Sequence, residues 1–420
     1  MMENFTNTLY TNDNLFILTG LNSNLVDLIY LDPPFNSKRT YSAPIGSKAA
    51  GTSFKDMWSW QDVNEEYLYT LATRYPSLTK FITAIGGIHS KAMMSYLTYM
   101  AQRIIEMHRI LKDTGSLYLH CDPTASHYLK IVLDEIFGKN NFRNEIIWSY
   151  TGNSVPKKCF PKKHDVLFWY SKTYKFTFQP ERVLVPYSKL THKRYNHTDE
   201  NGRRYKVSAL RDGKQEIVYM KDGKYPDAVW TIPVIRGKER VDYPTQKPLA
   251  LLNRIILASS NEGDIVMDPF CGCATTCVAA QQLGRKWIGI DIEKQAVSLV
   301  MERLAEEKDG IKNMFTDFVA TEIIPHRSDV RYEPKSKSVK ERLYKEQNGI
   351  CNGCGNEYLI KDFHIDHIIP DSKGGGSYYE NYQLLCGHCN QTKGQRPMEF
   401  LRNVIKRREE LMENKIIFGE

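Results

Sequence analysis

The fold class is best indicated by ten residues, Val26-Asp27-Leu28-Ile29-Tyr30-Leu31-Asp32-Pro33-Pro34-Phe35. Its first six residues form a short, largely apolar run typical of a buried strand, and the two prolines stiffen the turn that ends it. Apolar residues recur at helical spacing over residues 96–111, residues 113–115 are expected to end that helix, and residues 116–120 predict a second buried strand. Strand, helix and strand in this order predict an α/β fold with a parallel sheet.

The same alternation returns in the second half of the chain. We expect a helix, a strand, a helix and a strand there, at residues 248–260, 265–267, 275–283 and 287–290. Residues 36–62 lack periodicity and are interpreted as a long mobile loop, and residues 151–240 break into turn sequences. The polar residues 323–338 are interpreted as a linker to a smaller C-terminal part.

Composition and charge indicate a globular protein that acts on a polyanion. Of the 420 residues, 41% are hydrophobic and 25% are charged, as in ordinary globular chains. No apolar run approaches the about 20 residues that a membrane span needs, and the first residues lack a signal-peptide pattern, so we expect no membrane partner and a cytoplasmic location. The formal charge of +8 is uneven, because residues 151–240 hold 20 Lys and Arg against 9 Asp and Glu, interleaved with aromatic residues. This stretch favours a module that contacts phosphates and bases; a solvated basic surface is the alternative.

A turn of small residues lies between the strand and the helix expected around residue 270. It reads Asp268-Pro269-Phe270-Cys271-Gly272-Cys273-Ala274-Thr275-Thr276, and such a turn lets the backbone approach a ligand at the carboxyl end of a parallel strand. Asp291 ends the next expected strand, where an acid can accept a hydrogen bond from a ribose hydroxyl. The pattern favours a cofactor site, although α/β turns without a ligand also show it.

Asp32-Pro33-Pro34-Phe35 resembles the catalytic signature of the DNA amino-methyltransferases, in which an Asp, Asn or Ser precedes two prolines and an aromatic residue. By that resemblance the Asp32 carboxylate and the Pro33 carbonyl accept the two hydrogens of an exocyclic amino group and align its nitrogen for attack on a sulfonium methyl. Pro33 and Pro34 fix the carbonyl geometry, and Phe35 stacks on the extruded base.

The order of the motifs resembles the permuted β group of these enzymes, and the likeness covers about residues 10–305. In that group residues 243–248 (Tyr-Pro-Thr-Gln-Lys-Pro) line the methionine end of the cofactor, which implies roles for Thr245 and Lys247. The resemblance implies a Rossmann-like S-adenosylmethionine-dependent sheet with an inserted target recognition domain. The implied cofactor contacts of the turn and the next strand are Asp268, Phe270, Gly272, Thr275 and Asp291.

The chain departs from the family at Ala274, which stands where the second glycine of the turn is usual. If that position needs a positive φ, alanine costs about 1 kcal/mol or more there. No Pro-Cys motif of the ring-carbon methyltransferases is apparent, so direct transfer to an amino nitrogen is favoured. An Asp at the first motif position leans toward adenine N6, and cytosine N4 is the alternative.

Two CxxC pairs near the C-terminus predict a closed, structural zinc site. They are Cys351 with Cys354 and Cys386 with Cys389, and four thiolates leave no open position on the metal. The remaining five cysteines are interpreted mainly as small buried residues.

The residues between and after these pairs resemble the HNH nucleases, whose compact ββα unit surrounds one divalent ion. By that resemblance Asp366 and Asn390 hold Mg²⁺ or Mn²⁺, His367 is the general base that activates water, and Asn381 orients the His367 ring. The alternative is a zinc module that binds DNA without cutting it.

These patterns divide the chain into five parts: a catalytic half (1–150), a target recognition domain (151–240), a cofactor-binding half (241–322), a linker (323–338) and an HNH domain (339–420). They predict a prokaryotic, site-specific methyltransferase of double-stranded DNA fused to a nuclease, as in a restriction-modification or phage-defence system. A non-catalytic DNA-binding protein is the alternative of another class. Many β-group members dimerise, so a homodimer stays open.

Overall fold

The computed structural model describes residues 7–34, 39–42, 53–56, 71–151, 156–209, 213–293, 300, 318–371 and 375–408, apart from positions 73, 236, 241, 242, 244, 397, 399, 403 and 406. Phe35, which is expected to stack on the base, lies outside the described residues. The other residues predicted to act in catalysis, to bind the cofactor or to hold a metal ion lie within the described ranges.

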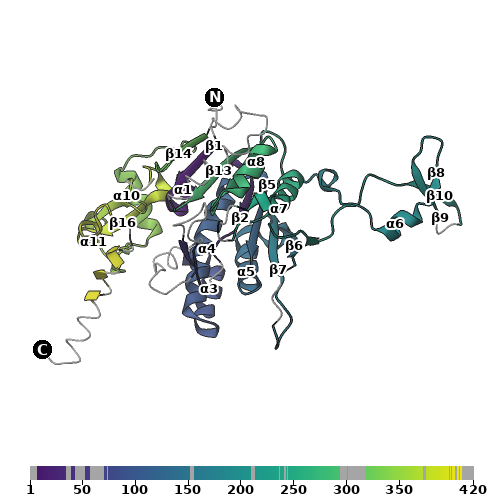
Figure 1. The fold of residues 1–420 in the computed structure, drawn as a ribbon. Coiled ribbons are helices and arrows are strands. Elements are labelled where there is room, and N and C mark those ends of the chain that lie inside the picture. Colours follow the sequence, from purple (N-terminus) through teal and green to yellow (C-terminus); the bar gives the residue numbers. More distant parts are fainter. Residues whose placement is uncertain are drawn as a thin grey trace.

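A nine-stranded sheet forms the body of the molecule (Figure 1). Its order is β11-β6-β7-β5-β2-β12-β13-β1-β14, and only β7 runs antiparallel to its neighbours. The strands are β1 (Asn7–Thr11), β2 (Val26–Leu31), β5 (Leu111–Cys121), β6 (Phe142–Ser149), β7 (His164–Ser171), β11 (Val229–Thr231), β12 (Ile265–Asp268), β13 (Lys286–Asp291) and β14 (Phe318–Thr321).

The chain reverses its direction across the sheet between the neighbouring strands β2 and β12. From β2 it continues to β5 on one side, whereas from β12 it continues to β13 on the other side. Because the connecting segments part here, the carboxyl ends of β2 and β12 border a crevice, the usual ligand site of an open α/β sheet.

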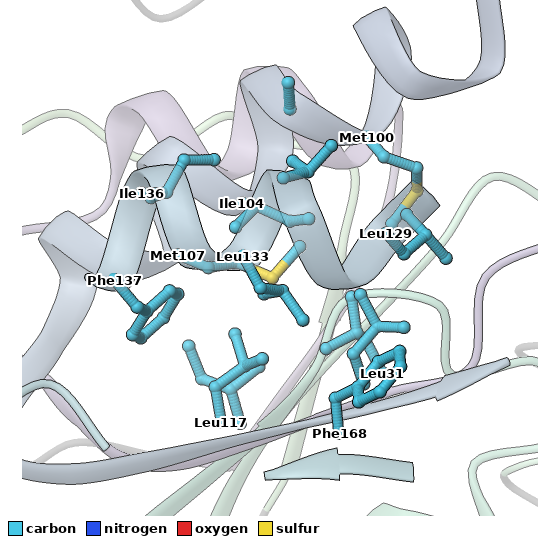
Figure 2. Packing of buried hydrophobic residues seen from close by; sticks show 14 of the residues in the cluster. Leu31, Met100, Ile104, Met107, Leu117, Leu129, Leu133, Ile136, Phe137 and Phe168 are labelled. Atoms are coloured by element: carbon cyan, nitrogen blue, oxygen red, sulfur yellow. The ribbon is translucent and has the colours of Figure 1, made fainter. Parts of the chain in front are cut away.

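Helices cover both faces of the sheet. One face carries α1 (Asn14–Gly20), α3 (Pro76–Ile88), α4 (Lys91–Ile110) and α5 (Ser126–Phe137), and the other carries α7 (Leu249–Ser259) and α8 (Thr275–Gln282). Figure 2 shows Met100, Ile104 and Met107 of α4 packed with Leu133 and Phe137 of α5 above the sheet. This repeat of three and four residues is the apolar pattern from which the sequence predicts a helix.

The structure confirms the predicted parallel α/β fold and moves some boundaries. α4 already ends at Ile110, and residues 113–115 lie within β5, where the pairing between β2 and β5 shifts register after Val26. A side chain at Gly115 would approach Leu111 to 2.7 Å, so this irregularity of the strand requires the small residue. The stretch 36–62 is not wholly irregular either, because β3 (Arg39–Ser42) and β4 (Ser53–Asp56) pair as a hairpin.

The basic middle stretch is partly sheet and partly an arm. β7 and β11 lie within residues 151–240 but belong to the nine-stranded sheet, and residues 172–183 are still bonded to the body, so the segment that leaves it runs over about residues 184–228. The arm carries α6 (Lys189–Arg194) and a three-stranded sheet of β8 (His197–Thr198), β9 (Arg204–Ala209) and β10 (Gln215–Tyr219). It projects away from the body at the right of Figure 1.

The C-terminal part is a small domain with its own core. β15 (Phe363–His367) and β16 (Tyr382–Cys386) form a hairpin, and α10 (Lys337–Glu346) and α11 (Gly387–Lys393) pack on it around Phe363 and Leu384. Hairpin and helix together give the expected ββα unit. Among the described residues, no helix is both long and apolar enough to cross a membrane.

The predicted linker at residues 323–338 is not a free tether. Ile324 packs against the core of the large domain, Ser328 and Asp329 bond to residues before β2, and α10 already begins at Lys337. Polar side chains there serve contacts between the domains, which composition alone does not reveal.

Candidate active sites

A cavity of about 250 Å³ lies at the carboxyl ends of the central strands. It is lined by residues that follow β1, β2, β12 and β13 and by the segment before α7. These include Asp13, Asn14, Asp32, Pro33, Pro34, Tyr243, Thr245, Lys247, Asp268, Phe270, Gly272, Thr275, Asp291 and Glu293. The described residues expected to hold the cofactor or act on the base therefore share one cavity at the reversal point of the sheet.

The described lining is predominantly acidic. Lys247 is the one cation among the described lining residues. The lining also holds five acids: Asp13, Asp32, Asp268, Asp291 and Glu293. Burial raises the pKa of Asp268 to about 7 and also raises the pKa of Asp291. Such a lining suits a ligand that carries positive charge.

Hydrogen bonds shape the turn between β12 and α8. The Asp268 carboxylate accepts from the Phe270 N–H at 3.0 Å and from the Thr276 hydroxyl at 2.5 Å. Asp291 Oδ2 accepts from the Gly272 N–H at 2.8 Å, so the acid that ends β13 also holds the turn. Gly272 has φ +51°, and a Cβ there would lie 2.9 Å from the Tyr243 ring.

Ala274 adopts the left-handed conformation that its position normally gives to glycine. Its φ is +53° and its ψ is +36°, and α8 begins directly after it. The condition under which the sequence predicts a cost is therefore met. The turn keeps its shape with an alanine, which is fully buried there.

Asp32 has one occupied and one open carboxylate oxygen. Lys247 Nζ forms an ion pair with Oδ2, whereas Oδ1 is buried and has no hydrogen-bond partner among the described residues. Lys247 is itself only 8% exposed, and its ammonium also donates to the Thr245 carbonyl at 3.2 Å. Lys247, expected at the cofactor, thus contacts the catalytic motif.

Asn14 and Arg103 support the cavity from α1 and α4 and were missed from the sequence. Asn14 Nδ2 donates to the Pro269 carbonyl at 2.7 Å, and Arg103 Nε donates to Asn14 Oδ1 at 2.6 Å. The Arg103 guanidinium stacks 3.3 Å from the Tyr99 ring centroid. No local motif marks this set, because its members lie far apart in the chain.

A buried polar chain runs from Tyr30 toward the outer strands and was also missed. The Tyr30 hydroxyl lies 2.8 Å from His120 Nδ1, and His120 Nε2 lies 3.1 Å from the Asp165 carboxylate. The Tyr150 hydroxyl donates to the same carboxylate at 3.2 Å. Alternate residues of β2 point to one face, so Tyr30 and Asp32 share this side of the sheet.

The four paired cysteines of the small domain converge. The sulfurs of Cys351, Cys354, Cys386 and Cys389 all lie within 4.8 Å of one another. The Cys389 thiol lowers the pKa of Cys351 to about 4, and the Cys386 N–H donates to the Cys351 sulfur at 3.2 Å. Convergent sulfurs, one of them held as thiolate, fit a tetrahedral zinc site.

The predicted metal ligand of the nuclease motif is bound by two side chains. Lys393 Nζ lies 3.0 Å from Asp366 Oδ2, and Gln383 Nε2 donates to the same oxygen at 2.8 Å. Both Asp366 and Lys393 are buried. Asn390 precedes Lys393 by three residues on α11, so the two lie on one helix face.

His367 and Asn381 lie at the two ends of the loop between β15 and β16. His367 Nε2 lies 3.3 Å from the Ser377 hydroxyl, and burial lowers the pKa of His367. The Asn381 side chain accepts from the Ile369 N–H at 2.9 Å and donates to the Gly376 carbonyl at 3.0 Å. Its hydrogen-bond partners among the described residues are backbone groups, so Asn381 shapes the loop beside His367, and its role in orienting the ring stays a prediction.

Comparisons with known proteins match both domains. A DNA methylase family model matches residues 26–302, and an HNH endonuclease model matches residues 351–396. The type II methyltransferase M.HpaI of Haemophilus parainfluenzae is 28% identical over 71% of this chain and 74% of its own. The DNA adenine methyltransferase YhdJ of Escherichia coli K12 is 28% identical over 71% and 82%.

A solved structure of the PvuII DNA methyltransferase (cytosine-N4-specific) is 14% identical, with a TM-score of 0.45, and covers 75% of this chain and 95% of that one. The family model alone spans well over half of the residues. The chain therefore belongs to the DNA methylase family of N6 and N4 methyltransferases, and it carries an HNH endonuclease domain at its C-terminal end.

Proposed function

We propose that this chain transfers the methyl group of S-adenosylmethionine to an exocyclic amino group in double-stranded DNA, with adenine N6 as the favoured acceptor. The observation that carries the proposal is the buried Oδ1 of Asp32, which accepts no hydrogen bond from the part of the chain that the structure describes and lies in the same cavity as Asp268 and Asp291. A buried acceptor without a donor is costly, so this oxygen is suited to a donor that arrives with a substrate.

Asp32 and Pro33 would orient the acceptor nitrogen. Asp32 Oδ1 and the Pro33 carbonyl accept the two amino hydrogens, which directs the nitrogen lone pair toward the cofactor side of the cavity. Lys247 keeps the other Asp32 oxygen engaged and fixes the carboxylate. Pro34 stiffens the turn, and Phe35 is proposed to stack on the extruded base.

Residues around the turn after β12 would hold the cofactor, which supplies an electrophilic methyl group when it is bound. Its sulfonium and ammonium charges match the acidic lining described above. Asp291 is proposed to accept from the ribose, while Phe270, Gly272, Thr275 and Thr245 border the remainder. Asp268 stabilises the turn through its bonds to Phe270 and Thr276.

Substitution of Asp32 tests this reaction. Tritiated methyl transfer to plasmid DNA should fall by at least about 100-fold in Asp32→Ala, because orientation of the nitrogen is lost. Glu341→Ala, an exposed acid on α10, is the matched control and should keep full activity. Equal labelling by wild type and Asp32→Ala would overturn the proposal.

The acceptor base and the DNA contacts belong to the same proposal. The Asp at the first motif position and the likeness to YhdJ, named a DNA adenine methyltransferase, support adenine. Cytosine N4 is the alternative, and nucleoside mass spectrometry of methylated plasmid distinguishes N6-methyladenine from N4-methylcytosine.

The basic stretch 151–240, with the arm at its centre, is proposed to recognise the target site. A homodimer stays a hypothesis that sedimentation would test.

For the HNH domain we propose metal-dependent cleavage of DNA. His367 would remove a proton from water that attacks a phosphate, and the lowered pKa of His367 keeps the ring neutral and able to accept it. Asp366 and Asn390 are proposed to hold Mg²⁺ or Mn²⁺, which supplies positive charge at the phosphate when bound. The four cysteines are proposed to hold structural Zn²⁺.

One observation favours a second candidate, a zinc module that binds DNA without cutting. Lys393 and Gln383 already engage the Asp366 carboxylate, so a metal ion would have to displace the Lys393 ammonium. Nicking of supercoiled plasmid in Mg²⁺ or Mn²⁺ by wild type, and its loss in His367→Ala, supports cleavage. No nicking by wild type supports the binding module.

Both activities in one chain suggest restriction-modification or phage defence in the cytoplasm of a prokaryotic cell. In that setting methylation of the recognition site protects host DNA from the nuclease. Plasmid methylated by the protein itself should then resist nicking, while unmodified plasmid is cut.

A further inference from the structure

Residues 322–333, called the strap below, connect the two domains and are bonded to the large one. Asn22 Nδ2 donates to the Ser328 hydroxyl at 2.8 Å, and the Ser328 N–H donates to Asn22 Oδ1 at 2.7 Å. Asp329 Oδ2 accepts from the Ser23 N–H at 2.9 Å, and Arg327 Nη2 donates to the Ser23 hydroxyl at 3.2 Å. These bonds fix the strap to the loop between α1 and β2.

Gly20 brings the strap into close contact with α1. A Cβ on Gly20 would lie 1.9 Å from the carbonyl oxygen of Pro325, a distance that no side chain can occupy. The other end of α1 carries Asp13 and Asn14, which line the cofactor cavity. The strap is thus packed on an element of the methyltransferase site.

The opposite end of the strap holds the nuclease domain. The Glu333 N–H donates to the Ser377 carbonyl at 2.9 Å, and the Tyr382 hydroxyl donates to the Glu333 carbonyl at 2.9 Å. Tyr378 is 7% exposed, and the Arg327 guanidinium lies 5.5 Å from its ring centroid. The strap therefore contacts residues 377–382, which lead into β16.

These contacted residues belong to the proposed nuclease centre. Ser377, whose carbonyl accepts from Glu333, also places its hydroxyl 3.3 Å from His367 Nε2. Asn381 bonds both Ile369 and Gly376, which border the same loop. A continuous set of contacts thus runs from the loop before β2, through the strap, to the histidine.

We propose that the strap mounts the HNH domain on the methyltransferase and positions its catalytic loop, so that nuclease activity depends on an intact strap. The proposal rests on the proposed cleavage function in its last clause only. Glu333, which bonds Ser377, and Asp329, which bonds Ser23 and Arg327 nearer the large domain, are positioning residues for His367.

A pair of glycine substitutions in the full-length protein tests this. Gly20→Ala must displace Pro325, whereas Gly87→Ala on α3 meets no atom within 4 Å. Both changes add one methyl group to a helical glycine, and neither touches a charged or catalytic residue. Asp329→Ala, with Glu341→Ala as its control, removes the side-chain bonds of Asp329 to Ser23 and Arg327 without adding bulk.

Hydrogen exchange of the Ser23, Ser328 and Glu333 amides measures whether the strap is bonded to the two domains, and it does not depend on nuclease activity. We expect slow exchange in wild type and Gly87→Ala, and exchange at least about tenfold faster in Gly20→Ala and Asp329→Ala. Plasmid nicking should fall about tenfold in the same two variants, while methyl transfer changes less than about twofold.

The readouts separate failure of this proposal from failure of the proposed nuclease. Fast exchange of these amides in wild type, or unchanged exchange in both strap variants, overturns the mounting. Faster exchange with unchanged nicking overturns the positioning role. A wild-type protein that does not nick DNA overturns the nuclease assignment and the positioning role with it, and exchange still decides the mounting.

Discussion

Lys247 determines which oxygen of Asp32 a substrate can reach. Its ammonium engages Oδ2 and leaves Oδ1 buried and open, so the ion pair is part of the acceptor geometry. Lys247 is 8% exposed, and removing one member of a largely buried ion pair leaves the charge of the other uncompensated. We therefore expect Lys247 to contribute to orientation of the base more than to binding of the cofactor.

Replacing Lys247 by glutamine should lower kcat more than it changes the KM for S-adenosylmethionine. Glutamine can still donate one hydrogen bond but brings no charge to hold the carboxylate, so we expect a fall in kcat of about 10- to 100-fold with a KM within about threefold. Steady-state methyl transfer at varied cofactor measures both constants. Lys337→Gln, on the exposed side of α10, is the control. A large rise in KM with unchanged kcat would instead return Lys247 to the cofactor.

Asp268 should make stability depend on pH with an unusual sign. Burial raises its pKa to about 7, above the value in an unfolded chain, so the folded state holds the proton more tightly. The free energy of unfolding that this group contributes is therefore present below about pH 4 and lost as the pH rises toward about 7. The loss is at most about 4 kcal/mol.

Asp268→Asn should remove this loss. An asparagine keeps an acceptor for the Phe270 N–H and a donor for the Thr276 hydroxyl but cannot ionise. Urea unfolding without cofactor, followed between about pH 5 and about pH 7.5, should show a flatter profile than wild type. The exposed Asp222→Asn should follow wild type. A variant that follows wild type across this range would contradict the assignment.

At the scale of elements, the turn before α8 shows how a fold keeps a conformation without its usual residue. A glycine at this position would relieve the left-handed strain and raise the free energy of unfolding by about 1–2 kcal/mol. Loss of the buried methyl group would lower it by about 0.8 kcal/mol, and the greater freedom of glycine in the unfolded chain would lower it by about 0.5–1 kcal/mol. The terms nearly cancel. An alanine can therefore persist here at little net cost.

Ala274→Gly should accordingly change stability by less than about 1 kcal/mol, whereas Ala279→Gly should destabilise by about 2 kcal/mol. Both alanines are fully buried, but Ala279 lies within α8 and has no positive φ to relieve. Denaturant unfolding of the two variants beside wild type measures the difference. Equal losses would show that the strain at Ala274 is negligible.

Short-range patterns in the sequence predict most of the helices and strands. The features that they miss are contacts between residues far apart in the chain. The strands that flank Asp32 and Asp268 follow from apolar runs, and the turn after β12 follows from its small residues. Residues 164–171 join the sheet as an antiparallel strand although they fall within a stretch assigned to the insertion, because pairing partners decide membership in a sheet. The Asn14–Arg103 pair and the strap join side chains about 90 and 300 positions apart, which no periodicity records.

At the scale of the whole molecule, the catalytic edge of the sheet continues into a basic loop. β6 ends at Ser149 and β7 begins at His164, and both ends lie at the edge where β2 ends at Leu31, directly before Asp32, since β7 runs antiparallel to β5. Neighbouring strands lie about 4.8 Å apart, so the base of this loop is on the order of 10 Å from the catalytic motif. DNA bound at Asp32 therefore passes close to the loop.

Phe160 in this loop should contribute to DNA binding by stacking. It is 95% exposed and lies among Lys157, Lys158, Lys162 and Lys163, which suit phosphates. Stacking of an aromatic side chain on a base is worth about 1–3 kcal/mol, so Phe160→Ala should raise the Kd for duplex DNA about 5- to 100-fold in fluorescence anisotropy. Tyr174→Ala is the matched control, because Tyr174 is 77% exposed but follows β7 at the opposite edge of the sheet. Equal losses of affinity in the two variants would contradict the prediction. They would show that loss of any exposed aromatic side chain weakens binding, whichever edge of the sheet it lies on.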